Sequence, residues 1–213
     1  MKTNLTKILF ITLTFVLATQ ASAMPVYLDS DNISVSIGSG TSSGTFNNTF
    51  NDGLSIDKVI DAPSSDAQEF HNQTTHIWYT ASSVGGGLEL DFDFGQSYDI
   101  STLHFWNYTS ERFDVDNIDF TFFDSDMNLQ GELSISPMLG SSSGISAQDI
   151  DLDAPLNVQF VTAFLSGSNR QVDFQNIGFT AEVSEVPAPP AVWLFGSALL
   201  AFAGIKRKKA NLS

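Results

Sequence analysis

The 213-residue sequence contains no cysteine, only 9 basic residues against 24 acidic ones, and only 3 histidines. Without cysteine there is no disulfide framework, thiolate nucleophile, iron–sulfur cluster or Cys-ligated zinc site. The shortage of Lys and Arg excludes recognition of a phosphate backbone, so nucleic acid is not an expected partner. A disordered acidic chain would also lack aromatic residues, whereas this one has 18 Phe. The sequence therefore indicates an acidic protein with a substantial buried core.

Signatures of catalysis are equally scarce. No Gly-x-Ser-x-Gly elbow accompanies His71, His76 or His104. His71 and His76 are five residues apart, which differs from the i, i+4 spacing of a helical zinc site. We therefore expect these histidines to lie in surface loops and the protein not to be an enzyme. Carboxylate pairs for glycoside hydrolysis can be drawn among 24 acidic residues, but nothing singles one out, so a hydrolase is a minor alternative.

Residues 1–23 have the features of a secretory signal peptide. Two lysines precede an apolar run from Ile8 to Ala18, and the segment closes on Ala21-Ser22-Ala23. A basic start, an apolar centre and an Ala-x-Ala ending are typical of signal peptides. We expect cleavage after Ala23 and an exported mature chain.

The C-terminal region has three parts: a Pro-rich stem (184–190), an apolar segment (191–205) and a basic tail (206–213). At a helical rise of about 1.5 Å per residue, the apolar segment is ~22 Å long, which is short for a hydrocarbon core of roughly 30 Å. We expect a short transmembrane helix with its basic end in the cytoplasm. The tail begins with Lys206, Arg207, Lys208 and Lys209.

This tripartite order resembles the PEP-CTERM sorting signal of Gram-negative bacteria. The resemblance implies export, a transient stay in the inner membrane, cleavage by an exosortase, and release to the cell surface or the exopolysaccharide matrix. Ala188 stands where the family has Glu, so the position of the cleavage is open, and an anchor that is never cut remains the alternative. The motif itself is Val186, Pro187, Ala188 and Pro189.

Between these ends, residues 24–183 show the alternation of half-buried strands. Residues 88–94 place four apolar side chains on one face and three carboxylates on the other, and no stretch shows a sustained helical period. Gly-, Asn-, Asp- and Ser-rich clusters separate the runs. The pattern predicts an all-β fold, an antiparallel sandwich or jelly roll. Further predicted strands are 33–37, 103–108, 118–122, 158–165 and 173–183.

The order of the runs from about residue 30 to 183 resembles the discoidin-type domain, a galactose-binding-like jelly roll also known from coagulation-factor C domains and bacterial carbohydrate-binding modules. Asp61 and the later Thr75-His76-Ile77-Trp78 resemble the family's Asp-Gly … Thr-x-x-Trp region, with Ala62 in place of the glycine. Residues 88–100 resemble its Leu-x-Leu-Asp-x-Gly-x-x-Tyr-x-Ile strands, with two extra residues before the glycine. The resemblance implies a discoidin-like jelly roll.

Calcium is the expected cofactor, because hard cations take carboxylate and carbonyl oxygens. The motif Asp124-x-Asp126-x-Asn128 opens like an EF-hand loop but has Leu129 at the glycine position, so we reject it. The discoidin resemblance implies another site, against which stands the simpler interpretation of residues 51–53 as a hairpin turn. The implied ligands are Asn51, Asp52, Asp61 and Glu182.

A carbohydrate is the expected ligand, in the form of exopolysaccharide or a cell-surface glycan. Sugar sites combine an exposed aromatic ring with a few orienting polar groups, and binding residues gather on loops. The candidates are Tyr108, Arg112 and Tyr79, whereas Trp78 and Trp106 are expected in the core. The competing hypothesis is a passive structural or adhesion protein of the matrix. Residues 24–186, which remain when the signal peptide and the tail beyond Val186 are removed, hold 3 basic residues against 24 acidic ones, a net charge of −21.

Overall fold

Nine strands form the fold in this computed structural model, which describes residues 24–46, 56–70 and 77–184. All pairings between these strands are antiparallel. The predicted signal peptide, residues 185–213 of the predicted sorting signal, and Asn51 and Asp52 lie outside the described residues. Within the described residues, none of the helices has the length and apolar character needed to cross a membrane.

The alternating runs form strands, as predicted. In the run 88–94, Leu88, Leu90, Phe92 and Phe94 are buried, whereas the three carboxylates between them are half-exposed. The elements are β1 (Val26–Leu28), β2 (Ser34–Ile37), β3 (Gly44–Phe46), the 3-10 helix η2 (Ile56–Ile60), β4 (Ile77–Ala81), β5 (Gly87–Asn107), β6 (Asn117–Phe123), β7 (Leu129–Ile135), β8 (Gln148–Ser166) and β9 (Gln171–Val183).

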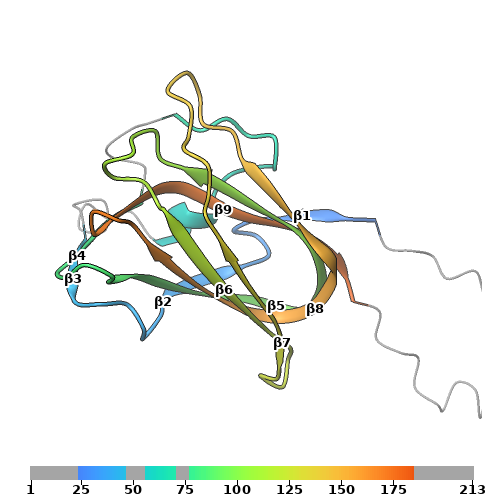
Figure 1. Ribbon diagram of the computed structural model, residues 1–213. Helices are drawn as coiled ribbons and strands as arrows, with labels where there is room; N and C mark the ends of the chain where they lie inside the picture. The colour runs from blue at the N-terminus through green and yellow to red at the C-terminus, as the bar shows by residue number, and fades with distance from the viewer. Residues whose placement is uncertain (1–23, 47–55, 71–76, 185–213) are drawn as a thin grey trace, which may run out of the picture.

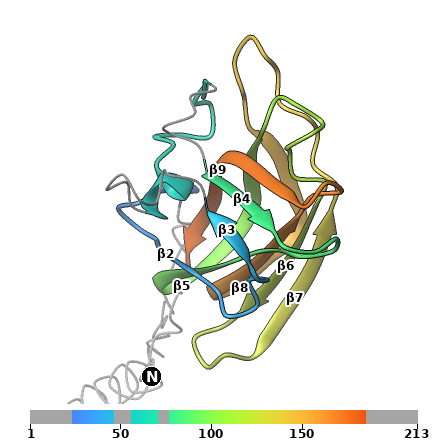
Figure 2. The ribbon, with the colours of Figure 1, turned by 90° about the vertical axis from the view of Figure 1, so that its left-hand side faces the viewer.

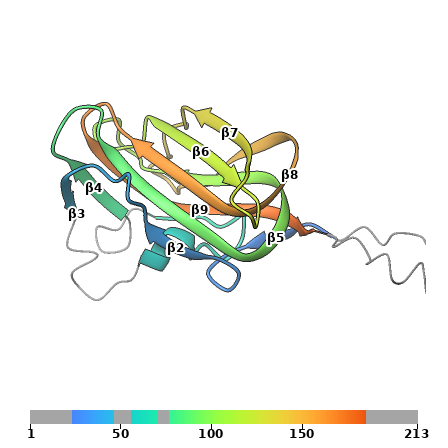
Figure 3. The ribbon, with the colours of Figure 1, turned by 90° about the horizontal axis from the view of Figure 1, so that it is seen from below.

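Two long strands, β5 and β8, belong to both layers of the sandwich (Figures 1 and 3). The first half of β5 pairs with β2 and with the end of β8, and its second half pairs with β9 and with the start of β8. The register shifts between Asp93 and Tyr98, where Gly95 has a φ of 69°. Glycine tolerates this left-handed conformation at little cost, so it allows the irregularity at which β5 changes partners.

The strand order β3-β4-β9-β5-β8-β6-β7 bends into two layers, with β1 added to β9 and β2 added to β5. One layer contains β2, β6 and β7 with the first half of β5, and the other contains β1, β3, β4 and β9 with its second half. Strands β3 and β4 stand at one end of this order, whereas β6 and β7 stand at the other. The prediction of an all-β antiparallel jelly-roll sandwich is thus confirmed.

Phenylalanines from the two layers meet in the core. The ring of Phe179 on β9 packs edge-on against Phe92 and Phe94 of β5, at centroid distances of 5.4 and 5.0 Å. Phe105 stacks on Phe174 at 5.7 Å. Burial of each such side chain contributes about 1.5–3 kcal/mol, so a chain without disulfides relies on this packing.

His104 lies in β5 and is only 4 % exposed, so the prediction of a surface loop is wrong for this histidine. Its Nδ1 lies 2.7 Å from Asp149 Oδ1, and its Nε2 lies 2.8 Å from Thr180 Oγ1. The reason is that β1 pairs with β9 on this face and brings the ring of Tyr27 to 5.7 Å from the imidazole. His71 and His76 lie outside the described residues.

Candidate functional site

Three segments meet at one end of the sandwich, and we call them the loop end: residues 67–70, 108–116 and 136–147. They project from the same end in Figures 1 and 2. The backbones of Glu69 and Ile145 exchange two hydrogen bonds of 2.8 and 2.7 Å, and Gly140 N donates to Tyr108 O at 2.7 Å. The buried Trp106 donates from its indole nitrogen to Ala67 O at 2.9 Å. Strand β5 thereby anchors all three segments.

The side-chain amide of Asn107, at the end of β5, organises two of these segments. Its Oδ1 accepts hydrogen bonds from Tyr108 N and Val115 N at 2.9 and 3.0 Å. Its Nδ2 donates to Val115 O and Met138 O at 3.0 and 3.1 Å. Because Asn107 is only 2 % exposed, water does not compete for these bonds. The loop end therefore has a defined shape before any ligand arrives.

A cavity of about 230 Å³ opens at the loop end between the end of β5 and the segment 136–147. Phe70 is 62 % exposed and lies against Gly144 in the cavity wall. It is the only aromatic residue among the exposed large hydrophobic side chains of the described residues. The cavity is also lined by the polar residues Ser141, Ser146 and Gln148, and at its base by the buried Asn107.

An exposed ring beside convergent polar groups is the arrangement that binds a sugar. Phe70 was not predicted from the sequence, because Gly144 is 74 positions away in the chain and only the fold brings the two residues together. The one available signal was a phenylalanine isolated in a polar segment, outside any alternating run.

Two of the predicted binding residues lie in the segment 108–116 of the loop end. Arg112 is exposed, and its guanidinium carbon lies 5.4 Å from the ring centroid of Phe113. Tyr108 is half-buried, with its ring 6.3 Å from that of Phe113. Burial and, to a smaller extent, the charge of Asp173 raise the pKa of the Tyr108 phenol, so it stays a neutral donor. Both side chains are thus near the loop surface.

The third predicted residue, Tyr79, has no exposed surface, and its assignment to a sugar site is wrong. It lies on the inner face of β4, where its hydroxyl donates a hydrogen bond to Ser42 O and its ring packs 4.9 Å from Phe46. Burial raises the pKa of its phenol. The alternation of β4 places every second residue inside, and Tyr79 follows the half-exposed Trp78 in that pattern.

Three carboxylates gather in the same segment: Glu111, Asp114 and Asp116, with one oxygen of each within 4.8 Å of the others. Asp114 is only 5 % exposed and forms an isolated parallel bridge with Asp173. Burial, reinforced by the charges of Asp116 and Glu111, raises the pKa of Asp114 to about 6. These three carboxylates were not predicted from the sequence, because their spacing matches no established motif.

The predicted calcium ligands are not brought together where the structure describes them. Asp61 forms an ion pair with Lys58, and the next residue, Ala62, donates from its backbone to Asn176 Oδ1 at 3.0 Å. Glu182 lies six residues beyond Asn176 on β9, which is about 20 Å at the rise of a strand. One ion does not bridge Asp61 and Glu182, so the predicted set of calcium ligands is wrong for these two residues. Asn51 and Asp52 lie outside the described residues.

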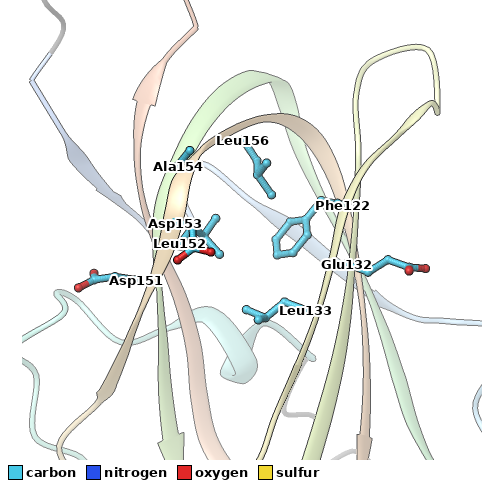
Figure 4. A pocket seen from close by; sticks show the side chains of 9 residues that line it. Phe122, Glu132, Leu133, Asp151, Leu152, Asp153, Ala154 and Leu156 are labelled. Atoms are coloured by element: carbon cyan, nitrogen blue, oxygen red, sulfur yellow. The ribbon is translucent and has the colours of Figure 1, made fainter.

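A second cleft, of about 330 Å³, lies between β7 and the middle of β8. Figure 4 shows Phe122, Leu133 and Leu156 pointing into this cleft, whereas Glu132 and Asp151 point away from it. An apolar interior offers few hydrogen bonds to sugar hydroxyls, so this cleft is a poorer sugar site than the loop end. The carboxylates of Asp149, Asp151 and Asp153 are exposed along β8, as expected for a solvated strand face.

No protein-family model matches the sequence, and no curated protein matches it. Solved structures do match. A family 32 carbohydrate-binding module, CBM32-3 from a family 31 glycoside hydrolase of Clostridium perfringens, has a TM-score of 0.50 at 10 % identity, covering 73 % of this chain and 95 % of that one. The described domain shares the fold of this module.

Two further structures are similar to this chain. The F5/8 type C domain of a Bacteroides fragilis protein has a TM-score of 0.49 at 11 % identity, covering 75 % of this chain and 98 % of that one. A family 32 module of C. perfringens NanJ, in complex with galactose, has a TM-score of 0.48 at 10 % identity, covering 74 % of this chain and 99 % of that one.

Proposed function

We propose that this domain is a non-catalytic carbohydrate-binding module that binds a glycan at the loop end. The observation that carries the proposal is Phe70, an exposed ring beside a cavity with polar groups in its wall. The ring provides the stacking surface, while Asn107 Oδ1 and Gln148 Oε1 already accept backbone hydrogen bonds that fix the cavity wall. The fold likeness to a carbohydrate-binding module supports this function.

The expected ligand is a neutral glycan such as an exopolysaccharide or a cell-surface oligosaccharide. With a net charge of −15 for the chain, the protein repels polyanions at long range. A cavity of about 230 Å³ is below the range of drug-sized pockets, which favours one or two sugar residues over a long oligosaccharide. The net charge and the cavity size support this class of ligand.

A glycan array probed with the full chain tests the function, using neutral and sialylated glycans with different terminal sugars. We expect binding to neutral glycans and a loss of at least tenfold in affinity for Phe70→Ala. The matched control is Leu129→Ala, because Leu129 is 56 % exposed on β7 and lies outside the loop end. Absence of binding to every glycan would leave the passive matrix protein as the better description. Equal losses of glycan affinity in both variants would contradict a binding site at Phe70.

We further propose that the chain is exported and sorted through its PEP-CTERM-like tail, with an exosortase as processing partner. The support is the sequence alone: residues 1–23 and the order of stem, apolar segment and basic tail. In a Gram-negative host that encodes an exosortase, mass spectrometry of the surface fraction should find a chain beginning at Met24 and lacking Lys206 to Lys209. Pro187→Ala should accumulate in the inner membrane, and normal release of this variant would refute the sorting signal.

A further inference from the structure

We propose that Glu111, Asp114 and Asp116 form a calcium-binding site in the segment between β5 and β6. One oxygen of each carboxylate lies within 4.8 Å of the other two. Calcium binds oxygen at 2.3–2.6 Å, so two ligands of one ion lie up to about 5 Å apart. The three carboxylates therefore have the spacing of ligands of one ion. The proposal does not depend on carbohydrate binding.

The strongest indication of a missing ligand is that Asp114 is buried with a carboxylate oxygen that has no hydrogen-bond partner. Its side chain is only 5 % exposed, and among the described residues no donor reaches its Oδ1. A buried carboxylate oxygen normally has a hydrogen-bond partner, because water is not available to it. The same carboxylate has one oxygen within 4.8 Å of an oxygen of Glu111 and of Asp116, so a cation bound by the three residues would contact this underbonded group.

The protein itself does not neutralise the cluster. Arg112 belongs to the same segment, but its guanidinium lies over the ring of Phe113, and no salt bridge in the described part of the chain joins it to the three carboxylates. Ser168 N donates to Oδ2 of Asp116, which leaves that residue's Oδ1 for an ion. The repulsion among the carboxylates therefore remains until a cation binds.

The donor set favours calcium over the other common metals. All three ligands are carboxylates, whereas zinc and copper select imidazole or thiolate ligands. Glu111 is exposed, so water molecules can complete the six to eight oxygens that calcium takes. A bound ion would hold Glu111 and Asp116 together around the buried Asp114. It would thereby stiffen the segment that carries Arg112 and that contacts residues 168 and 169.

The test is isothermal titration of the chelator-treated full chain with calcium chloride, in the absence of any sugar. We expect a single site with a Kd on the order of 10⁻⁴–10⁻³ M, the range of extracellular modules. Saturating calcium should raise the melting temperature. In Asp114→Asn and in Glu111→Gln/Asp116→Asn the affinity should fall at least tenfold and the thermal shift should disappear.

Asp119→Asn is the matched control, because Asp119 is an exposed carboxylate on β6 outside the cluster, and it should bind calcium like the wild type. Melting in chelator checks that each variant is folded. Absence of calcium binding to the wild type, or an equal loss in Asp119→Asn, would overturn the site. Since no sugar is present, such a failure is independent of the proposed carbohydrate binding, and glycan arrays run in chelator keep that function separately testable.

Discussion

The side chain of Asn107 pairs with the backbone of Val115 in the manner of a neighbouring strand: Val115 N donates to Oδ1, and Nδ2 donates to Val115 O, both at 3.0 Å. Both residues are buried. The pair closes the segment 108–116 into a loop that begins and ends at the same point of the sandwich. The candidate binding residues and the carboxylate cluster therefore share one support.

Replacing Asn107 by Ala should destabilise the protein by about 3 kcal/mol, because two buried backbone groups of Val115 lose their partner. Urea unfolding measures this change. The control is Asn128→Ala, since the amide of Asn128 bonds to Asp124 in an exposed turn, and its loss should cost less than about 1 kcal/mol. Similar costs for the two variants would contradict a supporting role for Asn107.

The raised pKa of Asp114 predicts a pH dependence of stability in the calcium-free protein. The folded state holds a proton up to about pH 6, whereas the ordinary value is 3.8. Protonation of Asp114 contributes its whole stabilisation below about pH 4. As the pH rises to about 6 this contribution is lost, and the free energy of unfolding falls by at most roughly 3 kcal/mol.

Asp114→Asn in chelator should remove this decline, so the variant should gain stability relative to the wild type between pH 4 and 6 and keep the gain above pH 6. Comparing the two proteins separates Asp114 from Glu69, whose pKa is also raised, mainly by burial. Parallel curves of unfolding free energy against pH would contradict the assignment.

Gly140→Ala should weaken glycan binding while leaving the core intact. A Cβ at this position would lie 2.4 Å from Asn107 O and 3.0 Å from Tyr108 O, so the segment 136–147 must move away from β5. The control is Gly131→Ala, because there the new methyl meets a flexible leucine side chain at 3.1 Å. We expect at least a fivefold loss of glycan affinity in the first variant only, measured on the array-selected glycan.

Tyr79→Phe should destabilise the protein by about 1 kcal/mol without changing glycan affinity. The substitution removes only the hydroxyl that donates to Ser42 O, and the ring remains in the core. Chemical denaturation and glycan titration measure the two effects separately. A loss of glycan affinity at unchanged stability would restore Tyr79 as a binding residue.

Much of the fold was predictable because alternation is a local property. The runs 118–122 and 173–183 lie within β6 and β9, and the carboxylates of 88–94 point outward as expected. The sequence did not reveal that 88–94 and 103–108 belong to one strand. The strand instead continues through an irregularity at Gly95.

Residues of the candidate site were predictable from the sequence only where their position in a loop was enough to indicate exposure. Arg112 is exposed in a loop, as expected. Tyr79 was misplaced because the sequence did not show which face of β4 is buried, and Phe70 was missed because only the fold brings it next to Gly144. Asp114 could not be recognised, since burial of a loop carboxylate depends on β9. Contacts between distant segments decide these features.

The pairing of β1 with β9 sets Val26 opposite Ala181, so the chain enters and leaves the described domain at neighbouring points. In the adjacent strand, Tyr98 lies opposite Val183, and nine residues separate it from Asn107 at the loop end. At the rise of a strand this is about 30 Å. Any tether attached after residue 184 therefore holds the domain by its base and leaves the loop end facing outward, free to reach a polymer that the tether does not obstruct.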